Sequence, residues 1–318
     1  MKKLTALLCI LTMFLFAATA SAEAPVNLGA LTGPTGMGMV KVFEEAETSG
    51  TYSHTIAGAA DELVPLILQG KVDIVSVPAN LAATLYNKTQ GNIRALAVNV
   101  LGVLYIGEFN TQELNSLADL KGKTLYATGK GSTPEYFLRY VLTQNGIDPD
   151  KDVTIEWKTE PAEIVALLNA QQKGFVMLPQ PYVTAAATQL GEGFRPAVSL
   201  SDAWAELDNG TLCTTAVVMA RAEFAQENPQ AVEAFLSDFA DSVQWVNENV
   251  PEAAELCGKY EIIKAPVAKK AIPNCNIVCI TGNEMKDALS GCLQVIYDQN
   301  PQAVGGNMPL DDFYYGAE

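Results

Sequence analysis

The sequence has a single histidine, His54, and is poor in the motifs that mark common enzymes. It contains no G-x-S-x-G nucleophile motif and no Cys–His pair, and its carboxylates show no spacing that indicates an acid–base pair. Its glycines match neither GxxxxGK[ST] nor GxGxxG, which argues against nucleotide binding. A lone histidine within a strand is more often structural than catalytic. We therefore expect no enzymatic activity, no cofactor and no catalytic residues.

Long apolar runs are also scarce, and the one that stands out lies at the N-terminus. Lys2 and Lys3 precede an almost unbroken apolar stretch over residues 4–18, and the A-x-A sequence at residues 20–22 follows. This order predicts a secretory signal peptide that is removed after Ala22. Cys9 follows Leu8 rather than a small residue, so a lipoprotein signal is not indicated. No later run is long enough to span a bilayer.

Positive charge is in short supply after the signal peptide. The mature chain, residues 23–318, carries 18 basic against 36 acidic residues, a formal charge of −18. This balance disfavours nucleic acid and anionic membrane surfaces as partners. It leaves an anionic small ligand possible in principle, because a pocket has its own local field. The length suits two domains of ordinary size.

Cysteines are few, and their number in the mature chain is odd. The mature chain has five, at positions 213, 257, 275, 279 and 292. An oxidising compartment is compatible with disulfides, and a bridge among the last four cysteines would staple the C-terminal region. The odd number leaves at least one thiol free. Free buried thiols are the alternative. The Cys275-x3-Cys279 spacing has no second Cys/His pair nearby, and His54 is far away in sequence, so we expect no metal site.

The most informative stretch opens the mature chain. Val26–Leu31 is an apolar run typical of a strand, residues 32–38 are rich in Gly and Thr, and residues 39–47 suit a helix with one buried face. A loop of this kind exposes backbone N–H groups at a helix N-terminus, where an acceptor-rich ligand is favoured. An ordinary strand-to-helix turn is the competing interpretation.

Strands and helices then alternate, which predicts a parallel or mixed sheet covered on both faces. Asp61 is the expected cap of a helix over residues 62–69, with Pro65 in its first turn and Gly70 just beyond its end. The other expected elements of this part are strands at 51–56 and 72–77, a helix at 81–87 and an apolar stretch at 93–106.

A second set repeats this plan. The expected elements are a strand at Thr124–Thr128, a Gly/Ser/Thr loop at 129–134, helices at 135–144, 163–171 and Tyr182–Leu190, and a strand at 175–178. LVPLILQGKVDIVSVPANLAATL and IVALLNAQQKGFVMLPQPYVTAAAT share an order of helix, short strand, proline corner and Ala/Thr-rich helix. This echo predicts two lobes of similar α/β architecture, whose loops meet where open α/β sheets bind ligands.

The remaining chain contains no third copy of the echo. It predicts a strand at 212–220 and helices at 231–249, 252–260, 285–299 and 309–315. We expect it to return to the first lobe, so that segments near 99–107 and 210–215 form a two-stranded hinge. The expected limits are 23–104 with 213–318 for lobe 1, and 105–212 for lobe 2.

Three stretches carry a resemblance to a known family. They are LADLKGKTL at 117–125, GSTPEYFLRYVLTQNGID at 131–148 and FVMLPQPYV at 175–183. The chain resembles the type II periplasmic solute-binding proteins of ABC transporters, in the branch of nitrate, sulfonate, taurine and thiamine-precursor binders. The resemblance implies a venus-flytrap fold of two mixed sheets flanked by helices and joined by a two-stranded hinge. It also implies a periplasmic monomer that captures a small molecule and delivers it to an ABC permease and its ATPase.

Residues that match the family's ligand-contacting loops follow from the same resemblance. They are Thr32, Thr35, Gly36, Met37, Ala59, Asp61, Pro78, Asn80, Ser132, Thr133, Gln180 and Tyr182. The opening loop carries Met37 and Met39 but no basic residue, and neither Arg139 nor Arg195 is placed at the cleft by the pattern. An oxoanion needs Arg or several N–H donors. These departures argue against a sulfonate or nitrate ligand, and uncharged aromatic or heterocyclic ligands, held by Met and Tyr contacts and a few polar groups, stay open.

Two other functions stay open at this point. The chain could be a ligand-loaded partner of a membrane receptor, because nothing in the sequence separates docking on a receptor from docking on a permease. It could also be a biosynthetic enzyme on the same fold, since related two-lobed proteins act in cofactor biosynthesis.

Overall fold

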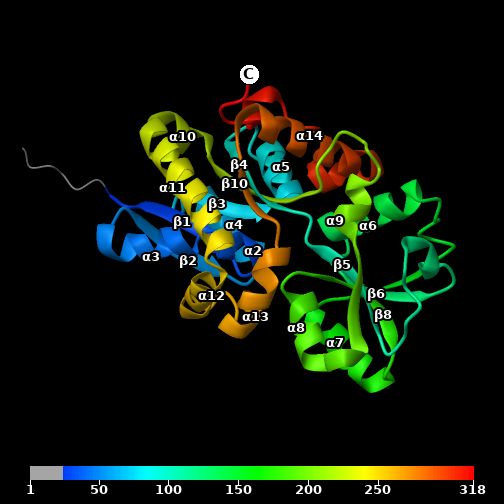
Figure 1. The fold of residues 1–318 in the computed structure, drawn as a ribbon. Coiled ribbons are helices and arrows are strands. Elements are labelled where there is room, and N and C mark those ends of the chain that lie inside the picture. The colour runs from blue at the N-terminus through cyan, green and yellow to red at the C-terminus, as the bar shows by residue number, and fades with distance from the viewer. Residues whose placement is uncertain (1–23) are drawn as a thin grey trace, which may run out of the picture.

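The computed structural model describes residues 24–318, so the expected signal peptide lies outside the described part. This part forms two lobes, each built around one mixed β-sheet with helices on both faces (Figure 1). The six-stranded sheet of lobe 1 has the order β11-β4-β10-β3-β1-β2. Its strands are β1 (Val26–Leu31), β2 (Tyr52–Ala57), β3 (Ile74–Pro78), β4 (Ile93–Leu101), β10 (Thr214–Arg221) and β11 (Ile277–Ile280).

The five-stranded sheet of lobe 2 has the order β7-β6-β8-β5-β9. Its strands are β5 (Leu104–Phe109), β6 (Thr124–Thr128), β7 (Thr154–Lys158), β8 (Gly174–Pro179) and β9 (Phe194–Ser199). Both sheets follow one plan. In lobe 1, β1 runs parallel to β2 and β3, and β10 lies antiparallel between β3 and β4. In lobe 2, β6 runs parallel to β7 and β8, and β5 lies antiparallel between β8 and β9. The two-lobed α/β fold is thereby confirmed.

The helices of lobe 1 cover two faces of its sheet. They are α2 (Pro34–Met37), α3 (Val40–Ser49), α4 (Ala60–Leu68), α5 (Ala79–Lys88), α10 (Ala222–Glu227), α11 (Pro229–Glu248), α12 (Val250–Lys259), α13 (Ala265–Ala271) and α14 (Gly282–Gln299). On one face Phe43 of α3 and Phe235 and Phe239 of α11 are fully buried. On the other face Leu63 of α4 and Leu289 of α14 are fully buried. Apolar side chains at helical spacing account for these burials.

The helices of lobe 2 are α6 (Thr133–Gln144), α7 (Pro161–Gln171), α8 (Tyr182–Leu190) and α9 (Leu200–Ala205). The α4-β3-α5 and α7-β8-α8 segments hold equivalent places in the two lobes, as the sequence echo predicts. In each, an apolar strand buried on both faces lies in the middle of the sheet, between a parallel neighbour (β1 or β6) and an antiparallel one (β10 or β5).

The chain crosses between the two sheets twice, and the crossings lie side by side. It leaves lobe 1 between β4 and β5 at Gly102 and Val103, and it returns between α9 and β10. A Cβ atom at Gly102 would lie 2.4 Å from Ser201 Oγ and 3.0 Å from Cys213 Sγ. Only glycine fits between the two segments at this point.

Several expectations about local structure are wrong. Residues 32–38 are not a plain loop, because Pro34 begins the short helix α2. Helix α4 begins at Ala60 with Ala59 as its N-cap, so Asp61 lies inside the first turn and is not the cap. Pro65 then falls in the second turn rather than the first. Residues 309–315 contain only the 3-10 turn Asp311–Phe313 instead of a helix.

Of the two alternatives for the cysteines, a C-terminal disulfide is not formed among the described residues. All five cysteines within residues 24–318 are free, and four of them are buried. Free buried thiols, the alternative, are confirmed. Within the same residues, no helix combines the length and apolar character needed to cross a bilayer.

Candidate functional site: a cleft between the two lobes

The cleft is formed by the two sheet edges at which the parallel strands end. Because β1, β2 and β3 are parallel, their C-terminal ends share one edge of the first sheet, and helices α2, α4 and α5 begin just beyond it. Helices α6, α7 and α8 begin in the same way beyond β6, β7 and β8. Each edge therefore presents helix N-termini and the loops before them, the usual place for a ligand on open α/β sheets.

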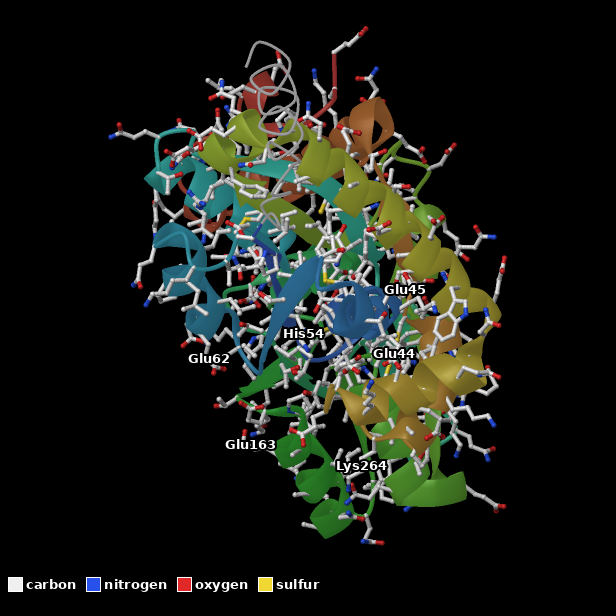
Figure 2. The ribbon with its side chains drawn as sticks, turned by 90° about the vertical axis from the view of Figure 1, so that its left-hand side faces the viewer. Glu44, Glu45, His54, Glu62, Glu163 and Lys264 are labelled. Carbon is white, nitrogen blue, oxygen red and sulfur yellow. The ribbon has the colours of Figure 1, made fainter. Side chains whose placement is uncertain are left out.

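Two contacts show that these edges face each other. Thr133 Oγ1, at the start of α6, donates a hydrogen bond to Asn80 Oδ1 of α5 at 2.9 Å. A Cβ atom at Gly33, before α2, would lie 3.8 Å from Pro181 Cδ, before α8. Figure 2 shows the two lobes from the side, with Glu62 on one lobe and Glu163 on the other, both near the boundary between the lobes. The lobes are thus in contact across the cleft.

The opening loop of lobe 1 contributes backbone groups to the cleft, whereas its side chains mostly turn toward the lobe itself. Thr35 Oγ1 donates to Leu31 O at 2.9 Å, so its hydroxyl ties the loop to the strand. A Cβ at Gly36 would lie 2.7 Å from Leu31 O, which excludes any side chain there. Met37 is fully buried in the lobe 1 core, and its sulfur lies 3.8 Å from Cys275 Sγ. Met37 is therefore placed in the core, away from the cleft surface, and Met39 is equally buried.

The remaining predicted residues of lobe 1 lie at helix starts. Thr32 follows β1, and its N–H donates to Ala57 O at 2.9 Å. Ala59 and Asp61 are exposed at the N-terminus of α4. Pro78 ends β3 as the N-cap of α5. Among these residues and Asn80, only the Asn80 side chain forms a hydrogen bond with the described part of the other lobe.

Lobe 2 brings four predicted residues to the opposite edge. Ser132 is the N-cap of α6, and its Oγ donates to Gly129 O at 2.8 Å. Thr133 follows it and is buried. Gln180 is buried beside β8, whereas Tyr182 at the start of α8 is exposed. Partial desolvation of the Tyr182 ring and the nearby Glu160 raise the pKa of its phenol, although the residue remains partly exposed, so the hydroxyl stays neutral and can donate a hydrogen bond.

Buried polar residues at the base of the cleft form a further group that the sequence analysis did not assign. Ala216 of β10 pairs with Pro78, so Thr214 and Thr215 lie at the cleft end of the sheet. Asn99 Nδ2 donates to Ser76 Oγ at 2.6 Å beside them. Within residues 24–318, Asn99 Oδ1 and both threonine hydroxyls are buried without a hydrogen-bond partner. Asn99 interrupting an apolar run was the available sequence signal.

The electrostatics of the cleft loops are set by carboxylates that accept the loops' own N–H groups. Glu62 Oε1 accepts from Ala59 N at 3.1 Å, and Glu135 Oε2 accepts from Gly131 N at 2.7 Å. Glu163 Oε2 accepts from Thr159 N at 3.0 Å. Each carboxylate lies at a helix N-terminus, where the helix dipole favours negative charge. These N–H groups are therefore already hydrogen-bonded within the chain.

The arginine side chains are likewise bound to groups of the chain itself. The sequence has four, and each forms an ion pair within the chain. The pairs are Arg94 with Asp312, Arg139 with Glu135 and Asp150, Arg195 with Glu108, and Arg221 with Asp73 and Glu223. Arg139 and Arg195 thus bind carboxylates of lobe 2. Within residues 24–318, no group of three or more His, Cys, Asp or Glu side chains is arranged to hold a metal ion.

Two similar mixed sheets with opposed edges define the type II periplasmic-binding-protein fold. The profile of the NMT1-like family matches residues 42–259, and the chain belongs to that family. An ABC transporter protein of Parabacteroides distasonis has the same fold, with a TM-score of 0.79 and 22% identity, covering 92% of this chain and 99% of that one. The periplasmic aliphatic sulphonate binding protein SsuA of Escherichia coli has a TM-score of 0.72 and 18% identity, covering 90% and 91%.

Two curated relatives are similar to this chain over only part of their own length. The nitrate/nitrite binding protein NrtA of Synechocystis sp. is 24% identical over 251 residues, which are 73% of this chain and 52% of that protein. The protein of the same name from Nostoc sp. is 24% identical over 166 residues, 51% of this chain and 36% of its own. The chain thus spans about half or less of these relatives.

Proposed function

We propose that this chain is the extracytoplasmic solute-binding component of an ABC importer. It captures a small organic molecule between its lobes and delivers it to a membrane permease that works with an ATPase. The observation that carries the proposal is the contact between the two matching sheet edges, seen in the Thr133–Asn80 hydrogen bond. Membership of the NMT1-like family supports it. The periplasm is the proposed location and a monomer the proposed state.

The proposed mechanism is closure about the two adjacent crossings at Gly102 and Cys213. The limits expected from the sequence, 23–104 with 213–318 for lobe 1 and 105–212 for lobe 2, lie within two residues of these crossings, although Leu104 belongs to β5 of lobe 2. Ligand binding must favour the closed arrangement over the open one, because only a difference in affinity between two states shifts their populations. The closed protein is the form that docks on the permease.

The ligand we propose is uncharged rather than an oxoanion. NrtA and SsuA are named for nitrate, nitrite and sulphonates. In this chain all four arginines form internal ion pairs, and glutamates occupy N–H groups of three cleft loops. An oxoanion would have to displace these carboxylates or rely on the exposed Lys130. A polar, uncharged ligand can instead bond to the orphan atoms of Asn99, Thr214 and Thr215.

A thermal-shift screen of the mature chain tests this function. The panel holds nitrate, sulfonates, amino acids, pyrimidines, purines and flavins. A ligand at about 100 times its dissociation constant adds about 2.7 kcal/mol of stability, a shift of a few degrees. A neutral hit that also lowers the radius of gyration in solution scattering supports capture by closure. A selective nitrate or sulfonate hit overturns the proposed ligand chemistry, and a hit without compaction overturns the mechanism.

Two further readouts separate the alternatives. Recovery of the bound compound unchanged, by mass spectrometry after long incubation, argues against the biosynthetic enzyme, whereas conversion would revive it. Genes for a permease and an ATPase beside this one favour transport over the receptor-partner function.

A further inference from the structure

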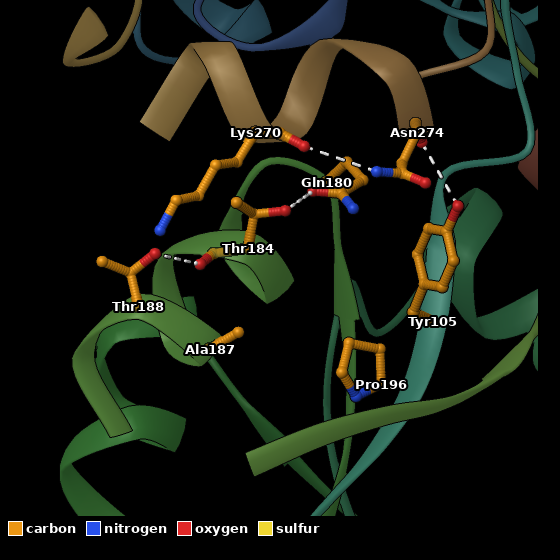
Figure 3. A pocket seen from close by; sticks show the side chains of 8 residues that line it. All are labelled: Tyr105, Gln180, Thr184, Ala187, Thr188, Pro196, Lys270 and Asn274. Atoms are coloured by element: carbon orange, nitrogen blue, oxygen red, sulfur yellow. Dashed lines mark hydrogen bonds between the residues drawn. The ribbon is translucent and has the colours of Figure 1, made fainter. Parts of the chain in front are cut away.

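The first sheet ends in an open edge at β2, on the outer side of lobe 1 (Figures 1 and 2). The strand order places β1 on one side of β2 and no described strand on the other. The pocket that Lys270 lines between α13 and α8 lies instead at the boundary of the two lobes (Figure 3). Figure 2 shows β2, marked by His54, facing the viewer between α3, which carries Glu44, and α4, which carries Glu62. The edge is thus separate from the cleft.

Every second residue of β2 has its backbone groups directed away from the sheet. Val26 N donates to Thr51 O at 3.0 Å, and Thr32 N donates to Ala57 O at 2.9 Å. Because the register between β1 and β2 is regular, the odd-numbered residues of β2 bond to β1. The N–H and C=O groups of the even-numbered residues therefore point outward and have no backbone partner within residues 24–318. These residues are Tyr52, His54 and Ile56. An added strand can bond to all of these groups.

The other edge strands of the described part carry features that oppose such pairing, and β2 does not. β7 contains Glu156 and Lys158, and β9 contains Arg195 and Pro196. β11 has only four residues, and its register against β4 is irregular. Charge, proline, shortness and irregular pairing are the usual protections of sheet edges. β2 has six residues, YSHTIA, with no Asp, Glu, Lys, Arg or Pro and a regular register. It is therefore open to a further strand.

The charge around this edge favours one kind of occupant. The helices on either side of β2 carry five acidic residues, Glu44, Glu45, Glu47, Asp61 and Glu62. Lys41 and Lys259 offset part of this negative charge. A second copy of the chain would bring the same acidic surface against this one, and each mature chain has a formal charge of −18. The edge therefore favours a basic segment over a second copy.

We propose that the edge of β2 binds an extended basic segment of another protein, which adds one strand to the first sheet. Side chains of a strand alternate between the two faces. On one face the segment meets Ile56 and the stacked rings of His54 and Phe43, so apolar residues fit there. On the other face it lies beside α4, where Asp61 and Glu62 favour lysine or arginine. Binding at this edge requires no ligand in the cleft, so the proposal is independent of the proposed function.

A synthetic peptide as long as β2, with lysine and valine in alternation and both ends blocked, tests the site on the mature chain. The control peptide has glutamate in place of lysine. Calorimetric titration measures affinity, and amide hydrogen exchange followed by NMR measures strand addition residue by residue.

The test variant is the double substitution Asp61→Asn with Glu62→Gln. Glutamine keeps an oxygen that can accept from Ala59 N, so the start of α4 should stay intact. The matched control is Glu284→Gln with Asp287→Asn, which removes the same charge from exposed residues of α14. Helix α14 packs on α5 and α6 and does not flank β2. Melting temperatures without peptide verify that both variants fold.

We expect the lysine peptide to bind the wild-type chain and the α14 variant equally, and the α4 variant about fivefold more weakly, as for two partly screened ion pairs. In the complex, amide exchange at Tyr52, His54 and Ile56 should slow about tenfold or more, whereas Ser53 and Thr55, already bonded to β1, should not change. The glutamate peptide should not bind.

Absence of binding by the lysine peptide overturns the proposal, and so does binding without the alternating protection along β2. Equal weakening in both variants also overturns it, because general charge then accounts for the effect. If raising the concentration of the chain alone protects the same amides, the edge pairs with a second copy and the proposed occupant is wrong.

Discussion

The hydroxyl of Thr133 donates a hydrogen bond to Oδ1 of Asn80 across the cleft, at 2.9 Å. The amide nitrogen of Asn80 is itself bonded to Ala303 O at 3.2 Å within lobe 1. Asn80 is therefore oriented before the lobes meet, and only the bond to Thr133 depends on closure. Thr133→Val keeps the shape of the side chain and removes this donor.

We expect Thr133→Val to weaken binding of the cleft ligand about two- to tenfold, the usual range for one net hydrogen bond. Calorimetric titration with the ligand found by the screen measures this. Thr89→Val is the matched control, because the Thr89 hydroxyl donates to Leu85 O within lobe 1, at the end of α5 away from the cleft edge. Equal affinity of Thr133→Val and the wild-type chain would contradict a role for the bond in closure.

The buried polar atoms without partners at the base of the cleft give a prediction about two quantities: removing them should leave stability unchanged or higher and should lower ligand affinity. Replacing Ser76 with Ala and Asn99 with Leu together removes a buried hydrogen-bonded pair and the unsatisfied Asn99 Oδ1. Replacing both partners of a buried pair by apolar groups is nearly neutral or stabilising. We expect unchanged or higher stability in urea denaturation, with ligand affinity reduced roughly tenfold. A loss of stability with unchanged affinity would show that these groups serve only the fold.

Glu108 holds a loop of lobe 2 through a fully buried carboxylate. Its donors are Thr111 Oγ1 at 2.6 Å, Glu113 N at 2.9 Å, Leu114 N at 3.2 Å and Arg195 Nε at 2.9 Å. Burial alone would raise the Glu108 pKa, but these donors together lower it. Stability from this group is present at neutral pH and is lost as pH falls through the lowered pKa.

Glu108→Gln should cost about 1–3 kcal/mol at neutral pH and flatten the acid part of the stability profile. Urea denaturation between neutral and acid pH measures both effects. Glu113→Gln is the control, because its side chain is about half exposed and pairs with Lys123 on the surface. An equal cost in the two variants would refute the special role of the buried carboxylate.

His54 should give the protein a weak pH dependence just below neutrality. Its ring stacks on Phe43 with centroids 4.5 Å apart and meets the edge of Tyr260 at 5.3 Å. Burial lowers the His54 pKa, with a smaller opposing effect of Glu47. Stability is therefore full above the unfolded pKa of about 6.5 and falls as pH drops toward the lowered folded value.

The fall cannot exceed about 1.4 kcal/mol per pH unit, because one group binds one proton. Since the sequence has no other histidine, His54→Gln should abolish the slope between neutral pH and the region where carboxylates titrate. Melting temperatures across this interval measure it. A slope that persists in His54→Gln would assign it to another group.

The five free thiols of the mature chain should differ in reactivity. Cys213, Cys257, Cys275 and Cys292 are buried, and Cys279 is partly buried. Burial raises the pKa of Cys257 and Cys292 to about 12 and that of Cys279 to about 11, so all three are poor thiolates. Thiol titration of native protein should react slowly at Cys279 alone, and five thiols should appear after unfolding. Fewer than five in the unfolded, unreduced protein would reveal a disulfide.

The plan of the fold could be predicted because its central strands are apolar on both faces. Proline and glycine residues also mark where several helices begin and end. Thr124–Thr128 and Tyr182–Leu190 match β6 and α8 residue for residue. The strands β7 and β9 were not predicted, because both are edge strands of mixed polarity, TIEWK and FRPAVS, with Pro196 in the second. Edge strands bury little and leave little periodicity in the sequence.

The candidate site was predicted in part. The loops were found, because helix starts after parallel strands have recognisable residues, and Asn80 and Thr133 do meet across the cleft. The direction of a side chain inside a loop was not predictable. Met37 sits among glycines in the sequence but turns into the core, since α2 forms a helical turn there. The base of the cleft depends on the pairing of β3, β4 and β10, which are distant in the sequence.

The position of β10 has a consequence for the order in which the molecule is assembled during synthesis. Strands β5 to β9 come from one uninterrupted stretch of chain, so the second sheet can form as soon as that stretch is made. In the first sheet β10 lies between β3 and β4, so these two strands have no common neighbour until residues 214–221 are made. The lobe begun first is thus completed last, and until then β3 keeps an unpaired edge that could join another chain.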